Sequence, residues 1–142
     1  MEFKNNGNEE ETIELTSFFE PVISTAKQDY SHQSFNNLFL TFEVVDGIIV
    51  VNRRIRSKKE SKMYLATCLY SNEDNINDLE YEIDKEKFLG RENLEIPNLV
   101  YKSSPFSSNI KLTVDPCIAI KKTFSIKPEE KKNFDLIISI SE

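Results

Sequence analysis

The sequence predicts an all-β protein, an antiparallel β-sandwich with at most one or two short helical turns. Apolar and polar residues alternate with a period of two in several segments, which is typical of half-buried strands. Turn residues separate these segments at short intervals, and no long segment has the 3.6-residue period of a helix. About seven or eight short strands with frequent turns favour a sandwich of two packed sheets.

The N-terminal region divides into a polar tail and a first strand. Residues 1–11 are polar and acidic, and we expect them to be disordered or frayed. Residues 12–18 alternate strictly, which predicts a strand, and Pro21 ends its ladder pairing because proline lacks a backbone N–H. Residues 24–30 are one of two segments in which a short helix is expected, and residues 28–35 are otherwise polar and loop-like.

A β-hairpin is predicted around Asp46-Gly47. The flanking segments, residues 38–45 and 48–54, are rich in aromatic and β-branched residues. A two-residue Asp-Gly link between such segments indicates a type I′ turn, which needs positive φ at both positions.

Further strands are predicted at residues 63–70 and 79–83. In the second of these, Leu79, Tyr81 and Ile83 should face inward, so that Glu80 and Glu82 face solvent. Asp84 then starts the other short helix, which closes at Gly90.

The last third of the chain predicts a terminal hairpin. Residues 91–108 should be irregular because they contain Pro97 and Pro105. Residues 118–126 and 134–140 alternate and flank a Lys127–Lys131 turn, with Pro128 suited to its second position. We expect this pair to bury one face.

Composition limits the function classes. The chain has 142 residues, enough for one domain, here residues 12–142. A net charge of −6 argues against nucleic acid as a partner. We see neither a signal peptide nor an apolar run near 18 residues, so we expect no membrane segment and a cytoplasmic location.

The residues offer no metal or cofactor site. One histidine and the separated Cys68 and Cys117 cannot form a tetrahedral zinc set, and both thiols should be buried and reduced. A calcium loop at residues 72–78 lacks its central glycine and closing glutamate. We therefore predict no metal and no cofactor.

Catalytic residues are also not indicated. His32 beside Ser31 is not a triad arrangement, and no spacing singles out an acid–base carboxylate pair. The basic segment 53–62 is interpreted as a solvated turn, with phosphate contact or pairing with residues 72–86 as alternatives. Four tyrosines are candidate sugar platforms, although core or rim packing is favoured for each: Tyr64, Tyr70, Tyr81 and Tyr101.

Four ordered stretches resemble one enzyme family. They are IELTSFFEPVI (13–23), SHQSFNNLFLTFEVVDGIIVVNRRIRS (31–57), FLGREN (88–93) and VDPCIAIKKTFSIKPEEKKNFDLIISIS (114–141). Together they resemble the N-terminal supersandwich region of the glycosyltransferase family 36, or glycoside hydrolase family 94, group. The likeness is greatest to cyclic β-1,2-glucan synthases and 1,2-β-oligoglucan phosphorylases. Gln33, Glu92 and the Lys-Pro-Glu-Glu turn depart from the family pattern.

The resemblance implies a non-catalytic β-sandwich fragment of a larger enzyme acting on β-glucans. In that family the catalytic residues belong to an (α/α)₆ helical barrel, which no segment here resembles, so no catalytic residue is carried over. Arg91 of FLGREN is the one candidate for substrate binding, against a structural role in the turn. The alternative function is a stand-alone carbohydrate-binding module. Expected partners are β-glucan or another carbohydrate, the barrel domain and, through an exposed strand edge, a second copy.

Overall fold

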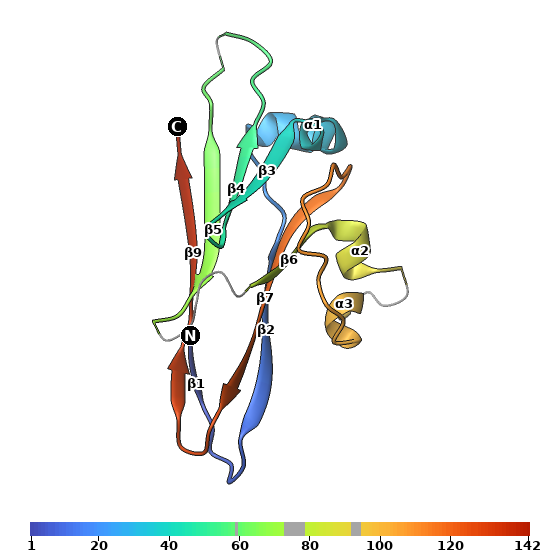
Figure 1. Cartoon of the computed structure of the whole chain (residues 1–142). Coiled ribbons are helices and arrows are strands. Elements are labelled where there is room, and N and C mark those ends of the chain that lie inside the picture. Colours follow the sequence, from blue (N-terminus) through green and yellow to red (C-terminus); the bar gives the residue numbers. More distant parts are fainter. Residues whose placement is uncertain (59, 73–78, 92–94) are drawn as a thin grey trace.

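The computed structural model describes residues 1–58, 60–72, 79–91 and 95–142, and confirms a sandwich of antiparallel sheets (Figure 1). The first sheet has the order β2-β7-β6, formed by Glu11–Phe19, Pro116–Ile126 and Glu80–Asp84. The second has the order β3-β4-β5-β9, formed by Leu40–Val45, Ile48–Arg53, Tyr64–Tyr70 and Asp135–Ser141. A small third sheet pairs β1 with β8, formed by Glu2–Lys4 and Lys131–Asn133.

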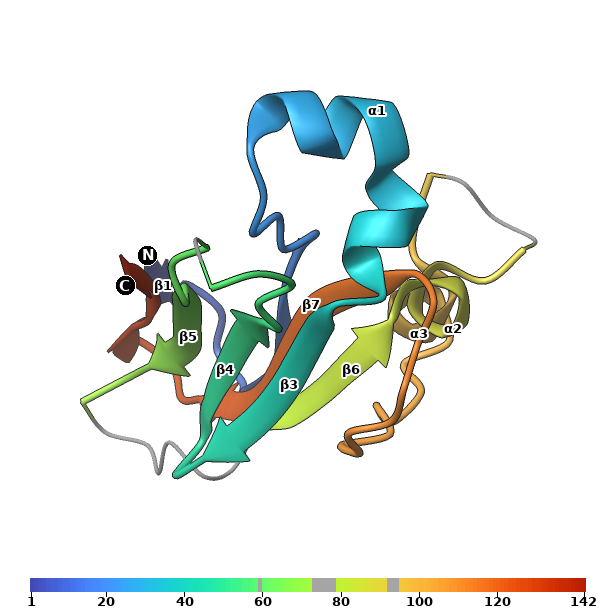
Figure 2. The ribbon, with the colours of Figure 1, turned by 90° about the horizontal axis from the view of Figure 1, so that it is seen from above.

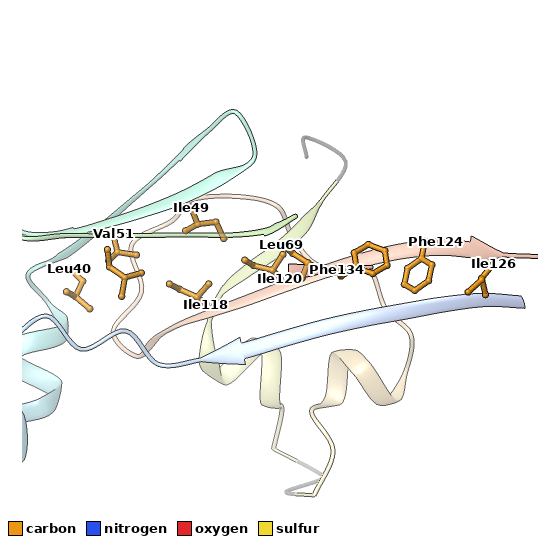
Figure 3. Packing of buried hydrophobic residues seen from close by; sticks show 10 residues of the cluster. Leu40, Ile49, Val51, Leu69, Ile118, Ile120, Phe124, Ile126 and Phe134 are labelled. Carbon is orange, nitrogen blue, oxygen red and sulfur yellow. The ribbon is translucent and has the colours of Figure 1, made fainter. Parts of the chain in front are cut away.

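The main core lies between the two larger sheets (Figure 3). Because side chains alternate along a strand, every second residue of β7 points into this space. Its partners come from β4 and β5 of the facing sheet. The buried set includes Ile118, Ile120, Phe124 and Ile126 from β7, and Ile49, Val51, Leu65 and Leu69 from β4 and β5.

Strand β7 is also covered on its outer face. Helices α2 (Lys85–Leu89) and α3 (Asn98–Tyr101) lie on the side of the first sheet away from the main core (Figure 1). There Phe88 and Phe106 pack with Cys117 and Ala119 in a second cluster. The expectation of one buried face for this strand was therefore wrong, because local alternation carries no information on helices that arrive from elsewhere in the chain.

The Asp46-Gly47 hairpin is confirmed. Both residues have positive φ, 49° and 76°, as a type I′ turn requires. Strands β3 and β4 pair directly across it, from Val45 opposite Ile48 to Leu40 opposite Arg53. Seen from above, this hairpin lies over β7, and β6 lies beside it (Figure 2).

The predicted terminal hairpin was wrong in its pairing. Strand β7 pairs with β2 and β6, whereas β9 pairs with β5 over its full length, from Asp135 opposite Tyr70 to Ser141 opposite Tyr64. The chain crosses between sheets at Phe134, which is 1% exposed and packs on Phe124 with ring centroids 4.5 Å apart. Between them, β8 pairs with β1 instead of β7. Burying Phe134 against Phe124 anchors this crossing.

The N-terminus is ordered, which corrects the expectation of a frayed tail. Strand β1 pairs with β8, and Phe3 packs edge-on against Phe124 and Phe134 at 5.5 and 5.9 Å between centroids. The buried Asn5 side chain donates to the carbonyl of Ile126 at 2.9 Å. These contacts hold the tail to the core.

The described residues contain three short helices, one more than predicted. Helix α1 (Ala26–Asn37) includes the whole of residues 28–35, which were expected to be a loop, and it is kinked at His32, whose φ and ψ are −152° and 52°. Phe35 near its end packs edge-on against Phe39. Helix α3 lies in the segment expected to be irregular. The sequence did not predict α1 because this helix is mostly polar and has little apolar periodicity.

Candidate functional site

The sequence-predicted candidate Arg91 lies at the exposed end of α2. Its side chain is 86% exposed and its guanidinium pairs with Glu86, with Nε donating to Oε1 at 2.8 Å. It does not line the pocket described below. Arg91 therefore remains a candidate for substrate binding, and its observed contact is with its own helix.

The rest of the FLGREN stretch has a structural role in the described residues. Phe88 is fully buried, stacked on Phe18 and edge-on to Phe106. Gly90 ends α2 with a φ of +71°, and a Cβ there would lie 2.5 Å from Cβ of Asn98. Only glycine fits this close approach between the two helices. Glu92 and Asn93 lie outside the described residues.

Glu82 corrects the prediction of a solvated carboxylate. It is 2% exposed, because residues 104–108 run along the outer face of β6. Its Oε2 accepts from Ser107 Oγ at 2.7 Å and pairs with Lys87 Nζ at 2.9 Å. Its Oε1 accepts from the backbone N–H groups of Ile83 and Asp84 at 3.1 and 3.2 Å.

The neighbouring Glu80 fixes the same segment. Its Oε2 accepts from the Phe106 backbone N–H at 2.7 Å, and its Oε1 lies 3.1 Å from Nζ of the buried Lys121. Lys121 also donates to the Ser104 carbonyl and lies over the Phe106 ring. The two carboxylates thus hold a loop against the sheet, and every oxygen of Glu82 is occupied by protein groups.

Burial alone would raise the pKa of Glu82. Hydrogen bonds from Lys87, Ser107 and the backbone of Asp84, with the charge of Lys87, outweigh burial and hold its pKa below the usual value. A carboxylate kept ionised and fully hydrogen-bonded is a poor general acid, because it lacks a proton to give at neutral pH. The arrangement therefore supports a structural role.

The basic segment 53–62 is only partly solvated. Arg53 has a side chain that is 10% exposed and it lines a pocket of about 270 Å³ together with Ser24 and Glu60. Arg56 stacks over the rings of Phe35 and Phe39. Glu60, the acid within the segment, pairs with both Arg53 and Arg56. The pairing of the basic segment with residues 72–86 stays a prediction. Residues 73–78 lie outside the described residues.

The tyrosine candidates separate by exposure. Tyr81 packs against the main core, Tyr64 lies beside Lys62, and Tyr70 donates to Asn72. Tyr101 on α3 is 67% exposed and presents a ring to solvent. Tyr30 on α1, at 95% exposed, was not among the candidates because nothing in its polar surroundings indicated it.

Strand β9 presents an apolar surface that the sequence did not indicate. Its residues opposite Leu65, Thr67 and Leu69 of β5 share the core-facing side of the sheet, yet they are exposed. We call them the β9 inner face: Leu136, Ile138 and Ile140, which are 37%, 48% and 64% exposed. The first sheet has three strands and the second has four, so β9 extends beyond the layer below it.

Comparison with protein families identifies the fold. A model described as the supersandwich domain of glycosyl hydrolase 94 matches residues 1–142. The chain belongs to this family. A curated relative, the cyclic beta-(1,2)-glucan synthase NdvB of Rhizobium meliloti strain 1021, is 28% identical over 131 residues. The match covers 90% of this chain and 5% of the relative, so the chain spans a small part of that protein.

This glycosyl hydrolase 94 supersandwich domain contains two cysteines. Cys68 and Cys117 are both buried free thiols, as predicted. Among the described residues there is no group of three or more His, Cys, Asp or Glu side chains suited to a metal ion. None of the described helices is long and apolar enough to cross a membrane.

Proposed function

We propose that this chain is the non-catalytic sandwich portion of an enzyme acting on β-glucans, and that it packs against a catalytic (α/α)₆ barrel. Membership of the glycosyl hydrolase 94 supersandwich family and the relation to a β-1,2-glucan synthase support the enzyme context. The observation that carries the packing role is the β9 inner face. It is an apolar surface on the core side of a sheet, and its three side chains are exposed in the part of the chain that the structure describes.

The β9 inner face fits a protein partner. Leu136, Ile138 and Ile140 form one row because alternate residues of a strand share a face. Residues 136–141 carry no charge or proline, the devices by which free strand edges usually avoid pairing. Covering such a row with another apolar surface removes it from water, at about 25 cal/mol for each Å² buried.

Two variants on one strand test this packing. Ile137 and Ile138 are equally exposed, at 47% and 48%, but they lie on opposite faces of β9. A separately purified helical barrel from the family should bind the chain, measured by calorimetry. Ile138→Asp should weaken binding at least about tenfold, and Ile137→Asp should have a much smaller effect. Equal losses, or no binding by the unmodified chain, would argue against the proposal.

The non-catalytic part is tested separately. The chain alone should release no glucose 1-phosphate from β-1,2-glucan and phosphate, because the resemblance places the catalytic residues of the family on a helical barrel that no segment of this chain resembles. Phosphate-dependent release by the purified chain, abolished by a single substitution in it, would refute this part.

A carbohydrate-binding module is the second candidate. The exposed Tyr101 ring on α3 favours it, since sugars stack on open aromatic faces. Titration with β-glucan oligosaccharides, followed by NMR, should then shift the Tyr101 ring signals saturably, and Tyr101→Ala should remove the response. A flat titration at millimolar sugar would exclude this candidate. Self-association through β9 is distinguished by light scattering, where a monomer at all concentrations would argue against it.

A further inference from the structure

A pocket lies between the start of α1 and the segment that joins β4 to β5. Its volume is about 270 Å³. Ile23, Ile55 and Met63 form an apolar wall, and Ser24, Arg53 and Glu60 supply polar groups. An apolar wall with a few converging polar groups is the usual composition of a small-molecule site. The pocket is separate from Arg91, Tyr101 and the β9 inner face.

Two residues of this pocket carry buried polar atoms without hydrogen-bond partners. They are Nε and Nη2 of Arg53 and Oγ of Ser24. Such atoms are rare in folded proteins because an unmade buried hydrogen bond costs stability. The Arg53 side chain is nine-tenths buried, so bulk water does not satisfy it. A ligand that brought hydrogen-bond acceptors to these Arg53 donors would therefore remove the energetic cost of leaving them unpaired.

The unpartnered atoms of Arg53 define which ligand fits. Nε–H and Nη2–H lie along one edge of the guanidinium, the edge that binds two oxygens of a carboxylate or phosphate at once. The other nitrogen, Nη1, faces Glu60, with 3.6 Å between Nη1 and Oε2. The ion pair with Glu60 thus leaves the two-donor edge uncommitted.

The charge balance favours an anion over a neutral sugar. Glu60 is shared by Arg53 and Arg56, so the cluster keeps a surplus of positive charge. Residues 53–62 contain six basic residues and one acidic residue, in a chain with a net charge of −6. The unpartnered nitrogens are donors without acceptor capacity, which a neutral hydroxyl satisfies less strongly than an oxyanion does.

We propose that this pocket binds a small oxyanion, a phosphate or carboxylate group, through the Nε and Nη2 edge of Arg53 with the Ser24 hydroxyl as a third contact. Nε and Nη2 are covered from solvent, which strengthens a charge-assisted hydrogen bond made there. Binding requires the wall residues after β4 to move apart, and that segment contains neither helix nor strand in its described residues. The proposal does not rest on the chain acting in glucan metabolism.

NMR titration of the 142-residue chain tests the proposal directly. Inorganic phosphate, glucose 1-phosphate and acetate are added at constant ionic strength, and the Arg53 Nε–H signal is followed. Saturable shifts with at least one of these anions are expected, and the comparison distinguishes free phosphate, sugar phosphate and carboxylate as sources. Sodium chloride and glucose should give no saturable shift. A saturable response to glucose alone, or to none of the additives, would overturn the proposal.

Matched variants assign the site. Arg53→Lys keeps the charge but loses the two-donor edge, and should weaken anion binding about tenfold or more. Arg54→Lys is the control, because Arg54 is exposed and donates to the Leu38 carbonyl outside the pocket. Ser24→Ala, which leaves Arg53 in place, should weaken binding by a smaller factor and decides the matter if Arg53→Lys fails to fold. Equal affinity in Ser24→Ala and the unmodified chain, with Arg54→Lys weakened, would place the anion elsewhere.

Discussion

Replacing Glu82 with glutamine should destabilise the domain by about 1–2 kcal/mol at neutral pH. The side chain is isosteric, so the change removes charge without creating a cavity. Glutamine can still accept from the Ile83 and Asp84 N–H groups through its oxygen, and Ser107 can turn its hydroxyl to accept instead of donating. The ion pair with Lys87 is lost.

The magnitude follows from the exposure of the partner. A hydrogen bond to a charged group contributes about 1.5–3 kcal/mol. Lys87 is half exposed, so water can solvate its ammonium group once the carboxylate is gone. The expected loss of unfolding free energy is therefore smaller than for a fully buried pair. For a domain of this size, the loss corresponds to a fall in the melting temperature of about 3–8 °C.

The stabilisation contributed by the Glu82 carboxylate should depend on pH. Because the folded pKa of Glu82 lies below its unfolded value, its ionisation stabilises the fold above the unfolded pKa of about 4.3. That contribution is lost as the pH falls through the folded pKa. The difference in unfolding free energy between the unmodified chain and Glu82→Gln should therefore be full at pH 7 and shrink below about pH 4.

Urea unfolding measured at several pH values is the appropriate assay. Glu86→Gln is the matched control: Glu86 makes an exposed pair with Arg91, which should contribute little. The reasoning fails if Glu86→Gln costs as much as Glu82→Gln, or if the Glu82→Gln deficit is unchanged at acid pH.

Three further substitutions or reactions test the packing. Gly90→Ala should cost at least about 2 kcal/mol in urea unfolding, because the added Cβ meets Asn98 and alanine disfavours a φ of +71°. Phe3→Ala should cost about 2 kcal/mol, since this half-buried ring packs on Phe134 and holds β1 in place. The Cys117 thiol should resist alkylation in the native protein and react in urea, because burial, with nearby carboxylates, raises its pKa far above the usual range.

Each of these has a distinguishing control. Gly7→Ala should cost less than Gly90→Ala, since the added Cβ would meet a single side-chain oxygen at 3.1 Å. Lys4→Ala removes an exposed pair beside Phe3 and should be nearly neutral. Rapid alkylation of native Cys117 at mildly alkaline pH would show that the second cluster opens far more readily than its burial indicates.

The sequence predicted the strands well because their signals are local. Period-two alternation marked β2 and β6, and the Asp46-Gly47 pair fixed both the place and the type of the hairpin turn. Such signals depend on residues within one element or one turn, so a single sequence is sufficient to read them. The same holds for the α2 cap, where Asp84 accepts from the Lys87 N–H as expected.

Burial of charged residues could not be predicted, because the groups that cover them are distant in sequence. Glu82 is enclosed by Ser107, 25 positions away, and its alternation with Tyr81 correctly placed it on the side opposite the main core. Arg53 ends a strand within a basic segment, which by itself indicates solvent. Only the fold brings Ser24 and the start of α1 over it.

The pairing of β7 with β9 was also predicted wrongly, because the two strands occupy different positions in different sheets. The sequences of β7 and β9 look alike, both alternating and β-branched, and proximity alone suggested a hairpin. In the structure β7 is the central strand of its sheet and is covered by the main core on one side and by α2 and α3 on the other. Strand β9 is an edge strand, and each of its residues is exposed.

This difference assigns the two strands different roles. Strand β7 contacts β2, β6 and both clusters, so a charge introduced on its buried faces would destabilise the whole domain unless it found partners. Lys121, the buried lysine of this strand, has such partners in Glu14, Glu80 and the Ser104 carbonyl. A charge introduced on β9 at Ile138 changes a surface that the domain itself leaves uncovered. Ile138→Asp should therefore leave the free chain nearly as stable as Ile137→Asp does while weakening partner binding at least about tenfold. A loss of stability confined to Ile138→Asp would mean that the domain already covers this face in solution.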